Sequence, residues 1–326
     1  DDINLYFLHE KGEDNAEIHT VAWNAFKAAT NVAKELKLYG AGQDLLSDAF
    51  SGNVRGMGPG AAEMTFTPRA SETLLFFMAD KTEPSAFSLP LSKVFLDPFT
   101  TTGLVIDPRM HNGFVFEIVD VLDHLRIKMN APEETYDILT LLGDTTRYAI
   151  KRIYSKDKNI DVAAVVSTEK LNVSAGKYVG KDDPVAIVRC QSGLPAIGEV
   201  LQPFMTPMLV PGWCRGSHYG AWYPCSVEDS GPTYFDGPPR ICALSMCING
   251  TRFQGLENSN SPVGEHIPVD LFKDPAWNIA RQQSVELSIA IRKHGPFMPA
   301  ILPPEEMEYT TRPDVLKKLK TRMEKM

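Results

Sequence analysis

Residues 73–80 read TLLFFMAD, and this uncharged run ending in an aspartate decides the fold class. Apolar residues run on without alternation over 73–79 and polar residues bound them, which predicts a buried strand. A short β-like run is also expected at 3–8. Further strands are expected at 113–121, 148–155, 161–168, 184–189 and 241–248, and 148–155 should pair with 161–168.

Segments with helical periodicity separate these strands. Between Glu13 and Lys37 apolar residues recur at helical spacing, which predicts a long amphipathic helix. Because helices and strands interleave without strict βαβ regularity, the predicted class is α/β or α+β in layers. Shorter helices are expected from residue 130 to Gly143, from Asp274–Pro275 to Gly295, and in the Lys-rich tail 313–326, while 202–240 should be irregular.

Composition excludes several classes of protein. The chain has 326 residues, 43% of them hydrophobic, and a net charge of −8 without a basic stripe, so nucleic acid is not the expected partner. No apolar run reaches membrane-spanning length. Five cysteines without a CxxC pair indicate reduced thiols in a cytoplasmic protein, with Cys242 and Cys247 as small core residues. The chain begins at Asp1 and reads as a fragment that lacks an N-terminal segment.

Acidic residues recur next to predicted strands. Asp1–Asp2 precede 3–8, Asp80 ends the quoted run and is followed by Lys81, and Asp182–Asp183 precede 184–189. Mg²⁺ prefers oxygen ligands, and several magnesium ions sharing carboxylates suit phosphate-ester hydrolysis. Each acidic pair taken alone is more often a turn or a helix cap than a metal site.

Residues 175–188, AGKYVGKDDPVAIV, place the amine of Lys181 and the phenol of Tyr178 close to two carboxylates. A free lysine has a pKa of about 10.4, which nearby aspartates raise further, whereas bound Mg²⁺ would lower it. A lysine nucleophile is therefore chemically reasonable only if the aspartates bind metal ions or point away from the amine.

Two loops offer anion contacts. The glycine-rich stretch 39–60 and Arg215 within 210–220 suit phosphate, through backbone N–H groups and a guanidinium respectively. A surface loop and a surface arginine are the alternative interpretations.

Several long motifs together resemble one family. YGAGQDLLSDAFSGNVRGMGPG, FMADKTEP, GKYVGKDDPV, LVPGWCRGSHYG, FDGPPR, KHGPFMP and EMEYTT occur in order. They resemble the archaeal-type bifunctional fructose 1,6-bisphosphate aldolase/phosphatases. The resemblance implies a single compact domain over 1–326 that lacks the family's first fifty or so residues. It also implies a four-layer α-β-β-α sandwich and a homo-octamer.

The resemblance further implies two consecutive reactions. Dihydroxyacetone phosphate and glyceraldehyde 3-phosphate condense through a lysine Schiff base, and the fructose 1,6-bisphosphate formed loses its C1 phosphate with Mg²⁺ to give fructose 6-phosphate for gluconeogenesis. Lys181 would form the Schiff base and Tyr178 would transfer the aldol proton. The implied metal ligands are Asp1, Asp2, Gln43, Asp80, Asp182 and Asp183. The implied substrate contacts are Tyr39, Gly52, Asn53, Lys81, Gln191, Ser192, Arg215, Asp236 and Tyr309.

The start of the chain departs from the family pattern, because an aspartate and a histidine of the family's first strand lie upstream of Asp1. His9 and His19 do not replace them and read as a strand-end and a helix-surface residue. Two rival functions stay open: a Mg²⁺-dependent sugar phosphatase without aldolase activity, and a non-catalytic sugar-phosphate-binding remnant.

Overall fold

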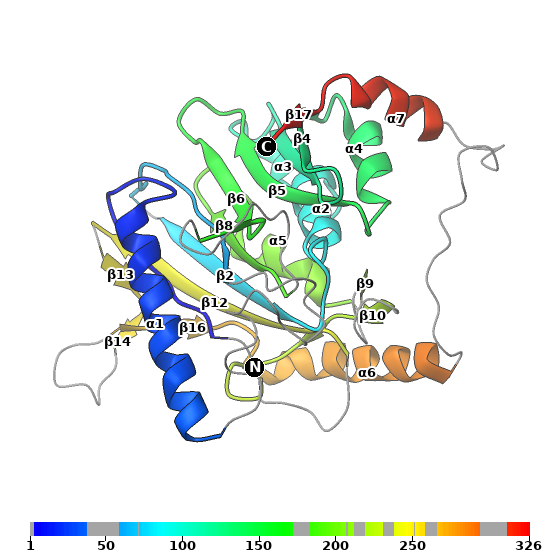
Figure 1. Ribbon diagram of the computed structural model, residues 1–326. Coiled ribbons are helices and arrows are strands. Elements are labelled where there is room, and N and C mark those ends of the chain that lie inside the picture. Colours follow the sequence, from blue (N-terminus) through cyan, green and yellow to red (C-terminus); the bar gives the residue numbers. More distant parts are fainter. Residues whose placement is uncertain are drawn as a thin grey trace.

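One large mixed sheet organises the part of the chain that the structure, a computed structural model, describes (Figure 1). The residues described are 3–37, 59–70, 72–171, 183–206, 208–211, 219–230, 238–250, 252–257, 266–293 and 312–326. Among them the sheet has eleven strands, in the order β11-β12-β2-β8-β6-β5-β3-β4-β17, with β13 and β16 also paired to β12. All neighbours are antiparallel except β11 and β12.

The strands of the large sheet are β2 (Thr73–Asp80), β3 (Phe114–Asp120), β4 (Leu125–Ala131), β5 (Tyr148–Ser155), β6 (Val162–Val166), β8 (Val185–Cys190), β11 (Tyr223–Pro224), β12 (Arg240–Asn249), β13 (Arg252–Gln254), β16 (Val269–Asp270) and β17 (Glu324–Lys325). Three separate pairs are β1 (Gly60–Ala61) with β7 (Glu169–Lys170), β9 (Leu209–Pro211) with β10 (Tyr219–Ala221), and β14 (Leu256–Glu257) with β15 (His266–Ile267). The helices are α1 (Ala16–Glu35), α2 (Ser88–Leu96), α3 (Gly103–Ile106), α4 (Thr135–Leu142), α5 (Ile197–Leu201), α6 (Asn278–Lys293) and α7 (Arg312–Lys320).

Strand β2 lies in the middle of the sheet and feeds two cores. Successive side chains of a strand point to opposite faces, so Leu75 and Phe77 enter the larger core, and Leu74 and Phe76 enter the smaller one. The burial of β2 confirms the buried strand predicted from this run. The neighbours β12 and β8 pair with β2 along most of its length.

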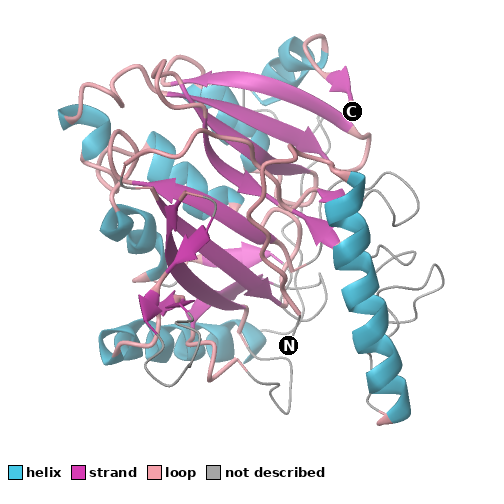
Figure 2. Ribbon diagram, turned by 90° about the vertical axis from the view of Figure 1, so that its left-hand side faces the viewer, coloured by secondary structure: helices cyan, strands magenta, loops and turns pink. Residues whose placement is uncertain are grey.

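The larger core lies between the sheet and the short helices α2, α4 and α7. Aromatic rings fill it: Phe204 stacks on Phe77 with centroids 5.3 Å apart and meets Trp222 and Phe272 edge-on. Figure 2 shows the sheet between these helices and the long helix α1, which stands alone on the other side. Such contacts add stability beyond area burial.

The smaller core is covered by the N-terminal segment 3–8, which is extended but forms no strand in the structure. The β-like run expected there is therefore wrong as a strand assignment. Its role is in packing: the Tyr6 ring meets Phe76 edge-on with centroids 4.7 Å apart, and the Tyr6 hydroxyl lies 2.8 Å from Sδ of Met78. Among the described residues, side-chain contacts hold this segment.

The long helix predicted between Glu13 and Lys37 is confirmed as α1. Asn15 caps it, with its side chain accepting hydrogen bonds from the amides of Glu17 and Ile18. Only part of its apolar stripe is buried, because Ala22 and Ala33 are buried whereas other positions are exposed. The exposed apolar side chains are Val21, Val32 and Leu36.

The other predicted elements are mostly confirmed. Strands lie at each of the five further expected positions, β5 and β6 pair as expected, and α4 and α6 follow the predicted capping signals. The C-terminal helix was predicted too long, because α7 ends at Lys320 and the tail forms β17, which pairs with β4. Cys242 is buried as expected, but Cys247 is exposed because it lies near the outer end of β12.

None of the described helices is long and apolar enough to cross a membrane. The structure confirms a mixed α/β fold with one large sheet. The four-layer arrangement stays a prediction.

Candidate active site

Two carboxylates lie at one edge of the large sheet, at the level where the central strand β2 ends and its neighbour β8 begins. Asp80 is the last residue of β2, and Asp183 lies two residues before β8, the strand that pairs with β2 in antiparallel register. The Ala79 amide donates to the Pro184 carbonyl at 3.1 Å, so pairing does continue beyond the end of β8. Two aspartates that lie over a hundred positions apart in the sequence therefore share one edge.

The turn that follows Asp80 fixes the side chain of Asp183. The Thr82 amide donates a hydrogen bond to Oδ1 of Asp183 at 2.8 Å, and the Thr82 hydroxyl lies 3.4 Å from the same oxygen. Asp183 itself has a φ of +52°, in the left-handed region that residues other than glycine rarely adopt. Such conformations persist where surrounding contacts hold them.

Lys81 also lies in the left-handed region, with a φ of +64°. Its Nζ is 3.0 Å from Oδ2 of Asp80, and both side chains are largely buried, with exposed fractions of 21% and 16%. An amine and a carboxylate in this position suit a phosphate contact and a cation ligand respectively.

A third strand brings a guanidinium to the same edge. Arg240, the first residue of β12, pairs directly with Asp80 across the ladder. The segment 231–237, which contains the predicted contact Asp236, leads into β12 at this point. The sequence reasoning did not single out Arg240, although its position directly before an apolar strand was a usable signal.

The small pair β1–β7 joins two segments that carry predicted site residues. Gly60 pairs with Lys170 and Ala61 with Glu169, and the Leu171 amide donates to the Pro59 carbonyl at 3.3 Å. The pair thus holds residues 59–61 beside residues 169–171. The latter segment then leads through 172–182 to Asp183 and β8.

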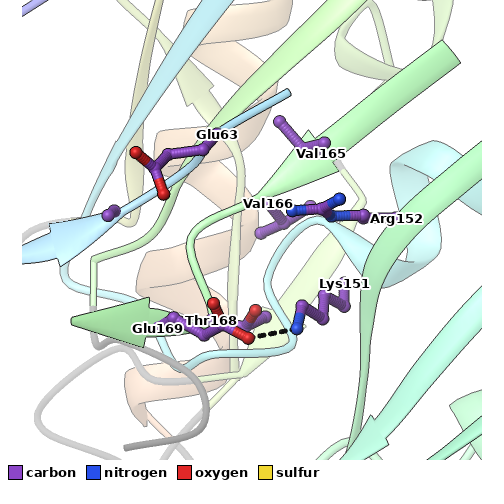
Figure 3. Close-up of a pocket in the computed structure, with 8 residues that line it drawn as sticks. Glu63, Lys151, Arg152, Val165, Val166, Thr168 and Glu169 are labelled. Atoms are coloured by element: carbon purple, nitrogen blue, oxygen red, sulfur yellow. Dashed lines mark hydrogen bonds and ion pairs between the residues drawn. The ribbon is translucent and has the colours of Figure 1, made fainter. Parts of the chain in front are cut away.

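A small pocket lies beside this pair (Figure 3). Lys151 is paired with Glu169 there, and Arg152 with Glu13. Every cation of the pocket therefore has a carboxylate partner, and we assign these charges to holding β7 and α1 on the sheet. The pocket is lined by Ala61, Glu63, Lys151, Arg152, Val165, Val166, Thr168 and Glu169.

His19 is buried, which corrects the prediction that it lies on the surface of the helix. Its Nε2 is 2.8 Å from Oε1 of Glu63, and its Nδ1 is 3.6 Å from Oδ1 of Asp14. The reason is that the first turns of α1 pack against the 59–70 segment through polar contacts, a pairing that helical periodicity alone does not reveal. His9 ends no strand in the structure.

Gln191 and Ser192 do not join the two aspartates within one chain. They follow β8 at its C-terminal end, whereas Asp183 precedes its N-terminal end. A strand rises about 3.3 Å per residue, so the eight steps along the chain from Asp183 to Gln191 hold these two groups roughly 25 Å apart.

The other predicted site residues lie outside the described residues. These are the catalytic pair Lys181 and Tyr178, the metal ligands Asp1, Asp2, Gln43 and Asp182, and the substrate contacts Tyr39, Gly52, Asn53, Arg215, Asp236 and Tyr309. Within the described ranges, no three His, Cys, Asp or Glu side chains gather as a metal site.

Comparison with known proteins identifies the family of the chain. A family model described as fructose-1,6-bisphosphatase matches residues 1–324. The chain therefore belongs to the fructose-1,6-bisphosphatase family.

Relatives within that family carry a more particular name, fructose-1,6-bisphosphate aldolase/phosphatase. The protein of that name from Ignicoccus hospitalis is 57% identical over 99% of this chain and 80% of its own length. Those from Methanothermobacter marburgensis and Moorella thermoacetica are 54% and 55% identical over the whole chain, and over 86% and 83% of their own lengths. The resemblance inferred from the sequence motifs is confirmed.

Proposed function

We propose that this chain catalyses two reactions in gluconeogenesis, an aldol condensation and a phosphate hydrolysis. Dihydroxyacetone phosphate and glyceraldehyde 3-phosphate are joined to fructose 1,6-bisphosphate, which is then hydrolysed at C1 to fructose 6-phosphate. Identities of 54–57% to proteins named for both activities support this proposal. The observation that carries it is the sheet edge that holds Asp80 and Asp183, the latter directly after the 172–182 segment.

Magnesium is the proposed metal. Asp80 and Asp183 fit it, because carboxylate oxygens on adjacent strands are the ligands that a hard cation prefers. We propose that they hold several Mg²⁺ ions together with Asp1, Asp2, Gln43 and Asp182. Bound Mg²⁺ would supply activation of water and neutralisation of charge on the departing phosphate.

For the aldol reaction we propose Lys181 as the nucleophile. Its amine adds to the C2 carbonyl of dihydroxyacetone phosphate and water leaves, which gives a Schiff base. Loss of a C3 proton from the Schiff base to solvent gives an enamine, whose C3 bonds to the aldehyde carbon of glyceraldehyde 3-phosphate while Tyr178 gives its phenolic proton to the aldehyde oxygen. Water then hydrolyses the new Schiff base, which frees Lys181 and releases fructose 1,6-bisphosphate, and the Tyr178 phenolate regains a proton from solvent. Both residues sit in the segment that ends at Asp183, so the amine and the carboxylates serve one ligand in succession.

The proposed substrate contacts are Lys81 at the sheet edge and, from other segments, Tyr39, Gly52, Asn53, Gln191, Ser192, Arg215, Asp236 and Tyr309. Gln191 and Ser192 lie too far from Asp183 to share its ligand within one chain. We therefore place them at the site of a neighbouring copy in a homo-oligomer, which is an octamer by resemblance to the family. The exposed apolar side chains on α1 support association. A single domain, a four-layer arrangement and a cytoplasmic location complete the proposal.

Two assays on the full-length protein test the function. Mg²⁺-dependent release of phosphate from fructose 1,6-bisphosphate tests the hydrolysis. Borohydride reduction in the presence of dihydroxyacetone phosphate tests the aldolase, because it makes a Schiff base permanent and adds the mass of the triose phosphate to the chain. Phosphate release without labelling would leave the phosphatase-only alternative, and absence of both would leave a binding protein.

A further inference from the structure

Three consecutive residues after β8 adopt a backbone conformation that side chains disfavour. Gln191, Ser192 and Gly193 have φ values of +68°, +50° and +95°. Gly193 is required there, because a Cβ would come within 2.9 Å of Cδ1 of Ile160. Residues other than glycine rarely adopt this region, and strained positions of this kind cluster at functional sites, where surrounding contacts must hold them.

The side chain of Arg69 holds this strained turn through hydrogen bonds to backbone carbonyls. Its Nη1 donates to the carbonyl of Gln191 at 2.6 Å and to that of Ser192 at 3.1 Å, and its Nη2 donates to the carbonyl of Cys190 at 2.9 Å. One planar guanidinium therefore contacts three successive carbonyls. Lysine, with a single ammonium, lacks this fork geometry.

Glu72 fixes the guanidinium of Arg69. Its Oε2 accepts from Nε of Arg69 at 3.0 Å, and its Oε1 accepts from Nη2 at 2.7 Å. On the other side, Arg189 donates to Oε1 at 3.1 Å and to Oε2 at 2.9 Å. The side chains of Glu72 and Arg189 are 0% and 1% exposed. The carboxylate thus lies between two arginines and cannot swing away.

Arg189 alone can balance the negative charge of Glu72, so Arg69 is not needed for that purpose. Arg189 already contacts both oxygens of Glu72 and is itself held by the Val162 carbonyl at 2.7 Å and by the ring of Phe66. The trio therefore carries one positive charge in excess, placed directly under the backbone of Gln191 and Ser192. An excess positive charge with little solvent around it favours an anionic ligand such as a phosphate ester.

We propose that Arg69 is a positioning residue for phosphate-ester binding. It acts by holding the Gln191–Ser192 turn in its strained form, and its uncompensated charge favours the anion that the turn contacts. This inference rests on the proposed function, since it assumes that Gln191 and Ser192 contact a sugar phosphate. Arg69 itself donates to carbonyls and to Glu72 and does not touch the ligand.

The test is steady-state kinetics on the full-length protein with fructose 1,6-bisphosphate. Arg69→Ala should raise KM about tenfold, the effect of losing one well-placed contact, while kcat changes less than about twofold. Millimolar guanidinium chloride, at matched ionic strength, should restore part of the lost affinity. Arg109→Ala is the matched control, because Arg109 packs against Gly193 but pairs with Asp107 and should leave KM unchanged.

A double-variant cycle separates this inference from the proposed function. If Arg69 acts through the turn, adding Arg69→Ala to Gln191→Ala should raise KM little further. If the increases in KM of the two single variants multiply fully in the double variant, the inference is wrong. It is also wrong if Arg69→Ala lowers the unfolding temperature and leaves KM unchanged. If Gln191→Ala raises KM and Arg69→Ala does not, this inference alone is wrong. An unchanged KM in Gln191→Ala would overturn the assignment of the turn as well.

Discussion

The amide of Thr82 donates a hydrogen bond to Oδ1 of Asp183 at 2.8 Å, so the residue two places after Asp80 fixes the carboxylate that precedes β8. The Asp183 amide donates in return to the Thr82 carbonyl at 3.4 Å. This reciprocal contact closes the edge between β2 and β8. It gives the two aspartates a fixed relation, as a shared cation site requires.

Asp183→Asn should raise the Mg²⁺ concentration for half-maximal phosphate release by about tenfold, because a neutral amide is a poorer ligand for a hard cation. The amide oxygen of asparagine still accepts from Thr82, so the turn should keep its form. Magnesium titrations of both proteins measure the change.

The control for this variant is Asp161→Asn, which removes an exposed aspartate next to β6. It should leave the magnesium titration unchanged. Identical titrations for Asp183→Asn and the parent would remove Asp183 from the metal site.

Lys181→Met should abolish borohydride labelling by dihydroxyacetone phosphate, because methionine keeps the length of the side chain and lacks the amine. Hydrolysis of added fructose 1,6-bisphosphate should fall much less. Lys177→Met, four positions earlier, is the matched control and should still be labelled. Labelling of Lys181→Met at the parent level, seen by mass spectrometry, would show that another amine is the nucleophile.

Tyr178→Phe should slow condensation by about 10²–10⁴-fold, the usual contribution of a group that transfers a proton. The ring is retained, so Schiff-base trapping on Lys181 should persist. Condensation rate and trapped fraction are measured side by side. Equal losses in both would indicate that Tyr178 shapes the site and transfers no proton.

The protein should lose stability in acid because the carboxylate of Glu72 becomes protonated. Burial alone raises the pKa of its carboxyl, but the hydrogen bonds from Arg69 and Arg189 outweigh burial and lower the pKa from 4.5 to about 2. The carboxylate therefore stabilises the fold fully above about pH 4.5, and this contribution, about 3 kcal/mol, is lost as the pH falls towards 2.

Urea unfolding between pH 6 and pH 3 measures this contribution. Glu72→Gln should be less stable at pH 6, because it leaves two buried guanidinium groups without their carboxylate. Its free energy of unfolding should then fall less with decreasing pH than that of the parent. Parallel curves for the two proteins would contradict the low pKa of Glu72.

Thiol labelling should distinguish the described cysteines. Burial raises the pKa of Cys190, and a hydrogen bond with Cys242, together with burial, raises that of Cys225, so both should be inert in the folded protein. Cys247 is exposed and should react within minutes. The Cys247→Ser variant should have one fewer thiol that reacts quickly with a disulfide reagent. Equal fast labelling of the parent and the variant would show that the fast-reacting thiol is not Cys247.

Much of the fold was predictable because buried strands and amphipathic helices leave plain periodic signals. The TLLFFMAD run and the helix after Glu13 both appeared where expected. Segment 3–8 is rich in apolar and aromatic residues like a strand, but its backbone finds no partner strand among the described residues, and a sequence does not show pairing. The tail was missed for the same reason, since β17 forms only by pairing with β4.

The candidate site was predictable in its residue types and not in its geometry. Asp80 and Asp183 were chosen for their places beside apolar runs, and the register of β2 and β8 then brought them together. The Arg69–Glu72–Arg189 group was missed because its three members look like ordinary surface charges along the sequence. Only tertiary packing shows that Glu72 and Arg189 are buried.

The order of strands at the centre of the sheet has a consequence for synthesis of the chain. Asp80 lies between β8 and β12, and Thr73 at the other end of β2 faces Cys247, 174 positions later in the sequence. Folding follows the emergence of the chain from its N-terminus. A ribosome must therefore extend the chain past residue 249 before β2 gains both neighbours, so the edge that carries Asp80 and Asp183 is completed only after β12 has been made.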